Sequence, residues 1–324
     1  VEPTGRAGPL LMAAWHHEHD DGRGYHAGCF NGRIEAPRLA GCALEGEAIA
    51  LAQADPRAGA VRDAIIGAWD FSQDISGERM VDISGNGHDG EVLHMPQRGV
   101  RGAAWSGREM CWRHAPDEYG AIHFHDDNVY DAGWDESHAW TVPDGTGSAL
   151  YALHVTVGDA EEFVPFAVVP PRGQRTADIC FLLPTATYMA YANSGRHFRN
   201  DSVEMKQFRC TQMALSDCFL QTHSEYGLST YDTHSDGSGV SVSSRLRPVL
   251  NLRPRGRVWG LVADTHITSW LEHAGHSFDV VTDEELHAEG VEVLDGYRVL
   301  VTGTHPEYHT TEMLDGLDAW LQRG

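Results

Sequence analysis

The sequence predicts two domains of different class, a β-sandwich over residues 1–172 and a doubly wound parallel α/β domain over residues 173–324. Three observations lead to this fold class. Short strands separated by glycine-rich turns fill the first half, which is typical of a sandwich. Paired prolines within residues 168–173 end a strand and stiffen a linker. After that linker, apolar runs alternate with helical patterns, which favours a parallel sheet.

The first half contains a glycine-rich run that indicates a jelly roll. Short strands are expected at 68–72 and within 82–92, where Gly85-Asn86-Gly87 and Asp89-Gly90 supply the positive φ angles of tight turns. The run from Asp82 to Gly90 resembles that of laminin-G-like, concanavalin-type jelly rolls, which says almost nothing about the ligand. Alternating strands are expected at 148–157 and 162–169, joined by a polar hairpin.

The second half is predicted to alternate strands with helices. Strands are expected at 178–184, 278–281 and 297–302, and helices at 264–275, after Thr282 as N-cap with Glu285 at the capping-box position, and at 310–321. Ligands of open α/β sheets bind beyond the carboxyl ends of the strands, where Glu307 lies. A last helix at 310–321 should lead to another strand, so we expect a chain truncated at its C-terminus.

Composition excludes several classes of partner. The net charge of −23 would repel nucleic acid and anionic membranes, and no apolar run reaches the 18 residues or more of a membrane span. Six cysteines without a CxxC pair indicate reduced thiols in a cytoplasmic protein. Three arginines (Arg245, Arg247 and Arg253) are expected to balance the acidic excess at the surface, or else to cover the edge of a site.

Two histidine clusters could bind a metal. The cluster at 16–21 has flanking glycines and charges, so we interpret it as a solvated loop. His123 and His125 would share one face of a strand. A two-histidine, one-carboxylate site needs a third ligand in a defined place. Strand-end histidines bonded to neighbouring carboxylates are the commoner arrangement, and we favour it here.

Several segments together resemble one known family. They are LPTATYMAYAN at 183–193, GLSTYD at 227–232 and THPEY at 304–308, with further matches at 121–127, 270–272 and 281–287. In order and spacing they resemble the large (β) subunit of N,N-dimethylformamidase, and the resemblance spans nearly the whole chain. It implies a longer subunit, with further catalytic residues beyond Gly324.

The resemblance also implies a metal centre and partners. The family holds a mononuclear iron with two tyrosines and a glutamate, for which Tyr191, Tyr231 and Glu307 are the best matches. Tyr188 or Tyr226 could replace a chosen tyrosine. The implied reaction is hydrolysis of small N-substituted formamides, such as N,N-dimethylformamide, to formate and the amine. The implied partners are a small (α) subunit and further copies of the large subunit.

The chemistry of these residues is consistent with a ferric site. A phenol ligates at neutral pH only beside a strongly charged cation, because its ordinary pKa is about 10. Hard oxygen ligands exclude thiolate-loving metals, and three ligands leave room for substrate and water. His305, two residues from Glu307, is a candidate proton carrier or orienting residue. Without the resemblance, packed rings with hydrogen-bonded hydroxyls would be the preferred interpretation of the tyrosines.

Two rival functions remain. A hydrolase with a cysteine nucleophile needs a cysteine on a sharp strand-to-helix turn, but Cys210 and Cys218 lie in a polar stretch. The jelly roll could instead be a carbohydrate- or protein-binding module with a structural α/β partner domain. Convergence of Tyr191, Tyr231 and Glu307 would discriminate against the binding module.

Overall fold

The computed structural model describes residues 9–18, 24–194, 215–255 and 259–324. Its contacts divide the chain into two compact units, residues 1–128 with 234–242, and residues 129–233 with 243–324. Each unit is described by itself. The predicted division at residue 172 stays a prediction, because contacts within one chain do not show which segments fold on their own.

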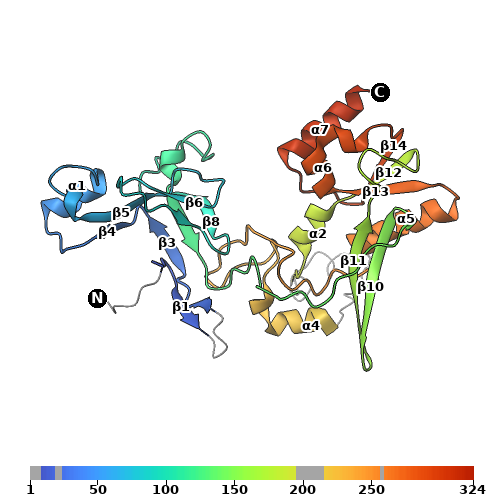
Figure 1. Ribbon diagram of the computed structural model, residues 1–324, viewed down its shortest axis with the longest axis horizontal. Helices are drawn as coiled ribbons and strands as arrows, with labels where there is room; N and C mark the ends of the chain where they lie inside the picture. The colour runs from blue at the N-terminus through green and yellow to red at the C-terminus, as the bar shows by residue number, and fades with distance from the viewer. Residues whose placement is uncertain (1–8, 19–23, 195–214, 256–258) are drawn as a thin grey trace. The chain divides into compact units, whose positions relative to one another are not determined.

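The first unit is built from antiparallel sheets. A ribbon pairs β1 (Trp15–Glu18) with β2 (Gly24–Ala27), and two further sheets have the strand orders β3-β9-β8 and β4-β5-β6-β7 (Figure 1). The remaining elements are β3 (Gly32–Glu35), β4 (Arg38–Ala40), α1 (Glu47–Ala54), η1 (Arg62–Ala64), β5 (Ile65–Asp70), β6 (Arg79–Asp82), β7 (Gly90–Glu91), β8 (Gln97–Val100), η2 (Pro116–Tyr119) and β9 (Ala121–Phe124). The predicted antiparallel strands are confirmed, and their arrangement as a jelly roll stays a prediction.

The glycine-rich run forms a turn that is held by one carboxylate. Asp82, at the end of β6, accepts hydrogen bonds from the backbone N–H groups of Ala68, Ser84 and His88 at 2.8–3.0 Å. These bonds keep the pKa of Asp82 down at about 2, against the opposing effect of burial. Gly85 and Gly87 have φ of 91° and 78°, as the pattern predicts. The glycine-rich motif thus has a structural role, because Asp82 and the two glycines hold the backbone in this turn.

The second unit contains the parallel sheet. The order β13-β12-β14 places β12 (Ile179–Leu183) between β13 (Phe278–Thr282) and β14 (Val299–Thr302). The other elements are β10 (Ala149–Val157), β11 (Ala160–Val168), α2 (Thr185–Tyr191), α4 (Leu215–Thr222), η4 (Ser224–Tyr226), α5 (Leu261–His273), α6 (Asp283–Glu289), η5 (Gly290–Leu294) and α7 (Thr311–Gln322). The predicted capping box is present, since Thr282 N–H donates to Glu285 at 3.0 Å.

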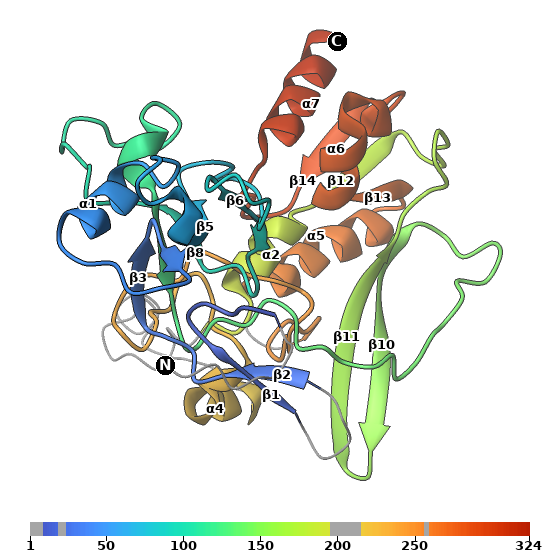
Figure 2. The same cartoon turned by 60° about the vertical axis from the view of Figure 1, so that its left-hand side comes forward.

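Helices cover both faces of this sheet. Alternate residues of β12 point to opposite sides, so Cys180 and Leu182 pack with Leu286 of α6 and Met313 of α7. The other set, Phe181 and Leu183, packs with Leu261 and Leu271 of α5. Helix α5 therefore lies on the opposite side of the sheet from α6 and α7, as Figure 2 shows. The connections after β12 and β14 therefore leave toward opposite faces. Their carboxyl ends form the switch point at which such sheets bind ligands.

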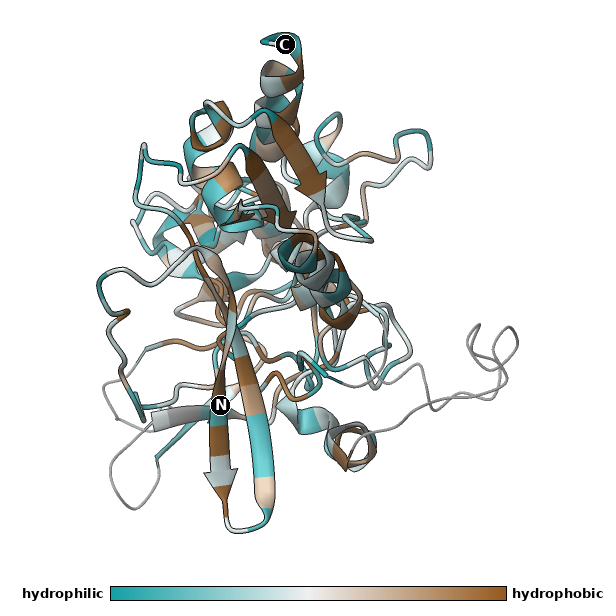
Figure 3. Ribbon diagram, turned by 90° about the vertical axis from the view of Figure 1, so that its right-hand side faces the viewer, coloured by the Kyte–Doolittle hydropathy of each residue, from teal (hydrophilic) through white to brown (hydrophobic). Residues whose placement is uncertain are grey.

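The hairpin of β10 and β11 also belongs to the second unit. We expected it in the sandwich, but Leu150 and Ala167 pack against the α5 side of the parallel sheet. Val280 N–H of β13 donates to Ser148 Oγ at 2.7 Å. The alternating pattern predicted the two strands correctly, because one side of the hairpin packs on a hydrophobic core. The pattern does not specify to which unit that core belongs. Figure 3 shows the mixed hydropathy of the long hairpin beside the brown parallel strands.

No helix in the described ranges is both long and apolar enough to cross a lipid bilayer.

Candidate functional site

The loop that carries Glu307 is fastened to the helix that follows β12. Thr187 of α2 is 3% exposed, and its hydroxyl accepts the N–H groups of Glu307 at 2.9 Å and Tyr308 at 3.2 Å. Asp264 of α5 accepts Thr304 N–H at 2.6 Å, at the start of the same loop. The backbone of the loop is therefore set by two side chains of the α/β core.

Residues 229–231 are fastened to the same helix. The carbonyl oxygen of Ala190 accepts the backbone N–H of Thr230 at 3.1 Å and the hydroxyl of Ser229 at 2.8 Å. These bonds use a carbonyl that the end of a helix leaves without an intrahelical partner. Tyr231 is thereby held beside Tyr191, and their rings stack with centroids 3.9 Å apart.

Four polar side chains of the second unit gather around Oε2 of Glu307, three in direct contact with this oxygen and one through Tyr231. The hydroxyls of Tyr191 and Tyr231 donate to Glu307 Oε2 at 2.8 and 2.7 Å. His305 Nε2 lies 3.0 Å from the same oxygen. Tyr308, in turn, donates to the Tyr231 hydroxyl at 2.9 Å. The structure brings together all of the predicted site residues, and their role as metal ligands stays a prediction.

The protonation states of the cluster follow from these contacts. Burial, aided by the neighbouring Glu307 carboxylate, raises the pKa of Tyr191 above its ordinary value. The pKa of Tyr231 is raised by burial and by hydrogen bonds with Tyr191, Tyr308 and Glu307. The pKa of Glu307 is lowered, chiefly by the hydrogen bond from Tyr231. Without a cation the phenols are therefore neutral donors to an ionised carboxylate.

The spacing of the oxygens fits a small, hard cation. Neighbouring ligands of an octahedral ion at about 2.0 Å lie about 2.8 Å from each other. The Glu307 oxygen lies 2.7–2.8 Å from both phenol oxygens. An ion of high charge could displace the two phenol protons, because it would stabilise the two phenolates and the carboxylate. Without a cation these three anionic oxygens would repel one another. The donor set thus suits a trivalent iron.

The two alternative tyrosines lie elsewhere. Tyr188 is 6% exposed and donates a short hydrogen bond to the buried carboxylate of Asp264. Burial, followed by the effect of Asp264, raises its pKa. Tyr226 is 37% exposed, and its ring contacts are with Phe219 and His223. Among the four candidate tyrosines, the geometry therefore favours Tyr191 and Tyr231.

Three residues near the cluster were missed by the sequence analysis. Trp259 lies with its ring centroid 5.7 Å from that of Tyr191 and 5.2 Å from that of His305. Tyr308 and Thr187 were missed too, although both lie inside segments that we had selected. Nothing in the sequence marks Trp259, because a lone aromatic residue between loops has no periodicity.

One expectation about charge was wrong. Arg247 is 2% exposed instead of lying at the surface. Its guanidinium donates to Gly227 O at 2.9 Å and to Ser243 Oγ at 3.0 Å, and burial lowers its pKa to about 10. It satisfies carbonyl oxygens that irregular backbone leaves without partners, which a sequence pattern cannot reveal. Arg247 thus supports the segment that leads to Tyr231.

The first unit contains a second polar cluster. His123 of β9 and His125, directly after its end, do lie on the same side of the chain, with ring centroids 4.1 Å apart. They contact a carboxylate, as expected for strand-end histidines, and it belongs to Asp236, which is distant in the sequence. Asp127 pairs with His234 instead. The reason is that the turn at 234–238, where Gly237 has φ 83°, presents its side chains to the strand end.

The remaining candidates offer no reactive group. Residues 16–18 of the first histidine cluster are exposed in β1, and residues 19–21 lie outside the described residues. Cys180 is buried in β12, which raises the pKa of its thiol to about 12. Cys218 is exposed in α4, and Cys210 lies outside the described residues. Cys180 and Cys218 therefore do not fit a nucleophile on a strand-to-helix turn.

Comparison with known proteins gives one consistent result. Residues 97–324 match the family described as N,N-dimethylformamidase beta subunit-like, C-terminal. The chain is 41% identical over 318 residues to the N,N-dimethylformamidase beta subunit of Paracoccus aminophilus, and 38% identical over 317 residues to that of an Alcaligenes species. Each alignment covers 94% of this chain and 41% of the relative. The chain thus spans about two fifths of the length of these curated relatives.

Proposed function

Because the chain belongs to the N,N-dimethylformamidase beta-subunit family, we propose that it carries the metal-binding part of an amidohydrolase for small N-substituted formamides. The products would be formate and the amine. The observation that carries the proposal is the convergence of the Tyr191 and Tyr231 hydroxyls on Glu307. The two phenols and the carboxylate come from three separate segments of the chain, so hydrogen bonding within one loop does not explain why they meet.

We propose Tyr191, Tyr231 and Glu307 as the ligands of one mononuclear iron, in the ferric state. When bound, iron would supply Lewis acidity to the amide carbonyl and to a nearby water. The ligands would contribute three negative charges, which balance a trivalent ion and stabilise it against loss. Their position at the switch point of the sheet leaves one side of the cluster to the loops, where a small substrate could enter.

The neighbouring side chains would handle protons and exclude water. His305, whose Nε2 lies 3.0 Å from Glu307 Oε2, is the imidazole of the cluster that would carry a proton from a water to the departing amine. The Tyr308 hydroxyl, bonded to that of Tyr231, is placed to steady the phenolate. The indole of Trp259 offers an apolar wall beside Tyr191 and His305, which suits the methyl groups of a dialkyl amide.

The relatives are named beta subunits, which supports a multisubunit enzyme. We propose that this chain associates with a small α subunit and with another copy of the large subunit. We also propose that the antiparallel sheets of the first unit, β3-β9-β8 and β4-β5-β6-β7, belong to a laminin-G-like sandwich. The alternative is that the sandwich is a carbohydrate- or protein-binding module and the α/β part its structural partner. A protein found to be metal-free and inactive would support that alternative.

Metal content and hydrolysis of the full-length protein with its small subunit test the proposal. Wild type should carry one iron per chain and release dimethylamine from N,N-dimethylformamide. Tyr191→Phe and Glu307→Gln should lose most of the iron and the activity together. Tyr151→Phe is the matched control, because its hydroxyl bonds only a nearby carbonyl in the β10 region. Iron-free wild type, or full activity in both site variants, would refute the proposal.

A further inference from the structure

A buried group of histidines lies at the carboxyl end of β9, within the first unit. His123 belongs to the strand, His125 follows it, and His234 comes from the turn 111 residues after His123. The ring of His125 stacks on that of His234 with centroids 3.6 Å apart. The side chains of the three histidines are 8%, 0% and 3% exposed. Because these three imidazoles are buried, contact with solvent does not explain why polar side chains gather here.

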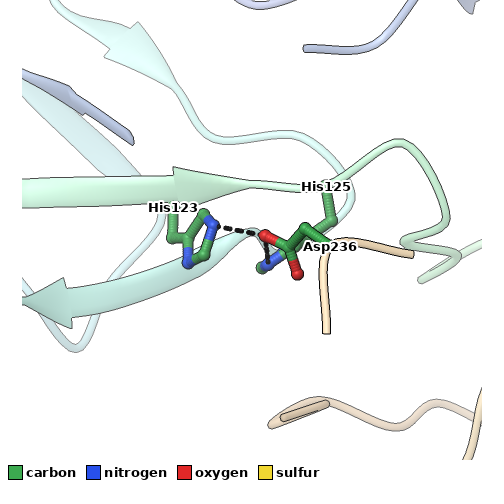
Figure 4. Close-up of side chains that lie close together, drawn as sticks. All are labelled: His123, His125 and Asp236. Carbon is green, nitrogen blue, oxygen red and sulfur yellow. Dashed lines mark hydrogen bonds and ion pairs between the residues drawn. The ribbon is translucent and has the colours of Figure 1, made fainter. Parts of the chain in front are cut away.

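Two of these rings point at one carboxylate. His123 Nε2 lies 2.9 Å and His125 Nε2 lies 3.8 Å from Asp236 Oδ2. Figure 4 shows both rings directed at this side chain from the same side of the strand. One ligand atom from each of the three residues lies within 4.8 Å of the others. Ligands of a tetrahedral zinc ion at about 2.0–2.1 Å lie about 3.4 Å apart, so small side-chain shifts would suffice.

Neighbouring groups orient the ligands as a metal site requires. Ser238 donates its backbone N–H and its hydroxyl to Asp236 Oδ1 at 2.8 and 2.6 Å. Oδ2 is therefore the oxygen that faces the two imidazoles. Asn128 Nδ2 lies 3.5 Å from His125 Nδ1, and exchange of the amide oxygen and nitrogen by rotation of this side chain would let it accept the Nδ1 proton of a metal-bound tautomer.

Hydrogen bonding alone accounts poorly for His123. Its Nδ1 is buried and has no hydrogen-bond partner within the described part of the chain. A buried polar atom in that state costs free energy, which a single bond from Nε2 to Asp236 offsets only in part. A metal bond at Nε2 would compensate for it. The cluster thus has the geometry and the unexplained burial of a ligand set.

We propose that His123, His125 and Asp236 bind one divalent transition-metal ion of the zinc type, independent of the iron site. Two imidazoles and one carboxylate suit zinc, and they are poorer ligands for magnesium or calcium, which prefer all-oxygen sites. Ser238 Oγ, 2.9 Å from His125 Nε2, or a water would complete a tetrahedron. Because Asp236 comes 113 residues after His123, the ion would fasten the 234–238 turn to the end of β9.

Zinc binding to the full-length protein, stripped with a chelator and then titrated with Zn²⁺, tests the proposal. Wild type should take up one zinc per chain in addition to any iron. Asp236→Asn keeps the size and hydrogen-bonding capacity of the side chain and removes its charge. It should weaken zinc binding by more than about 100-fold, since even outer-shell partners of metal ligands are worth about 10–100-fold. Its iron content should stay unchanged.

The control is His154→Ala, which removes an exposed histidine that pairs with Glu161 in the β10–β11 hairpin. This variant should bind zinc as wild type does. Titration of wild type with Co²⁺ requires no variant, and should give the visible ligand-field bands of a tetrahedral site. Absence of these bands, or equal zinc uptake by wild type and Asp236→Asn, would overturn the proposal and leave a hydrogen-bonded cluster that only joins the turn to the strand.

Discussion

Replacing Tyr188 and Tyr191, one at a time, separates the structural tyrosine from the proposed ligand. The two residues lie three positions apart in α2, and each change to phenylalanine removes one hydroxyl. Tyr188 donates to Asp264, a carboxylate that is 1% exposed and also holds the start of the Glu307 loop. Tyr191 donates to Glu307 at the exposed edge of the site. The two variants should therefore fail in different ways.

The expected magnitudes follow from burial. Tyr188→Phe leaves a buried carboxylate without one of its donors, and hydrogen bonds to charged groups contribute about 1.5–3 kcal/mol. In a domain of this size, that loss lowers Tm by about 3–12 °C. Tyr191→Phe removes a bond to a solvent-exposed oxygen, worth about 1 kcal/mol or less in the metal-free protein. Iron should be retained by the first variant and lost by the second.

Differential scanning calorimetry on the chelator-treated proteins, with iron content measured on the untreated ones, tests this pair. The reasoning about Tyr188 is refuted if Tyr188→Phe melts like wild type. The assignment of Tyr191 is refuted if its variant keeps a full complement of iron while Tyr188→Phe loses it without a fall in Tm. That second result would move the ligand by one helical turn.

Three further perturbations test the supports of the site. Gly303→Ala should lower iron content several-fold, because a Cβ there would lie 2.4 Å from Asp264 Oδ2 at the start of the Glu307 loop; unchanged metal content would show that the loop adapts. Arg247→Met should lower the free energy of unfolding in urea by about 1–3 kcal/mol, since it removes a donor from Ser243 Oγ and leaves the Gly227 carbonyl with only the Asn193 side-chain amide as a donor, and a loss below about 0.5 kcal/mol would contradict the role of Arg247. Burial raises the pKa of Asp283 to about 7. The contribution of its protonated carboxyl to the free energy of unfolding is therefore complete below about pH 4 and is lost as pH rises through 7. Asp283→Asn should therefore gain on the order of 3 kcal/mol over wild type between pH 5 and pH 8, and parallel pH profiles would contradict the raised pKa.

The α/β part could be predicted because its signals are local. Apolar runs of about five residues with helical patterns between them define β12, β13 and β14, and Thr282 with Glu285 marks the start of α6. The position of Glu307 follows from the rule that loops at the carboxyl ends of parallel strands carry function. The family resemblance then selected Tyr191 and Tyr231, which spacing alone would have left as packed rings.

The rest depended on long-range contacts that no local pattern encodes. Asp236 lies 113 residues after His123, so nothing in the sequence around the strand identifies it as the partner. Arg247 is buried because irregular backbone needs donors, and charge counting places arginines at the surface by default. In both cases the deciding information is which polar backbone and side-chain groups lack partners, and only the assembled structure shows that.

An anomalous difference map from crystals of the full-length protein, recorded at the iron absorption edge, tests the central claim most directly. We predict one peak per large subunit in contact with the oxygens of Tyr191, Tyr231 and Glu307. A map with no peak among those three oxygens, with their hydroxyls still hydrogen-bonded to the carboxylate, would contradict it.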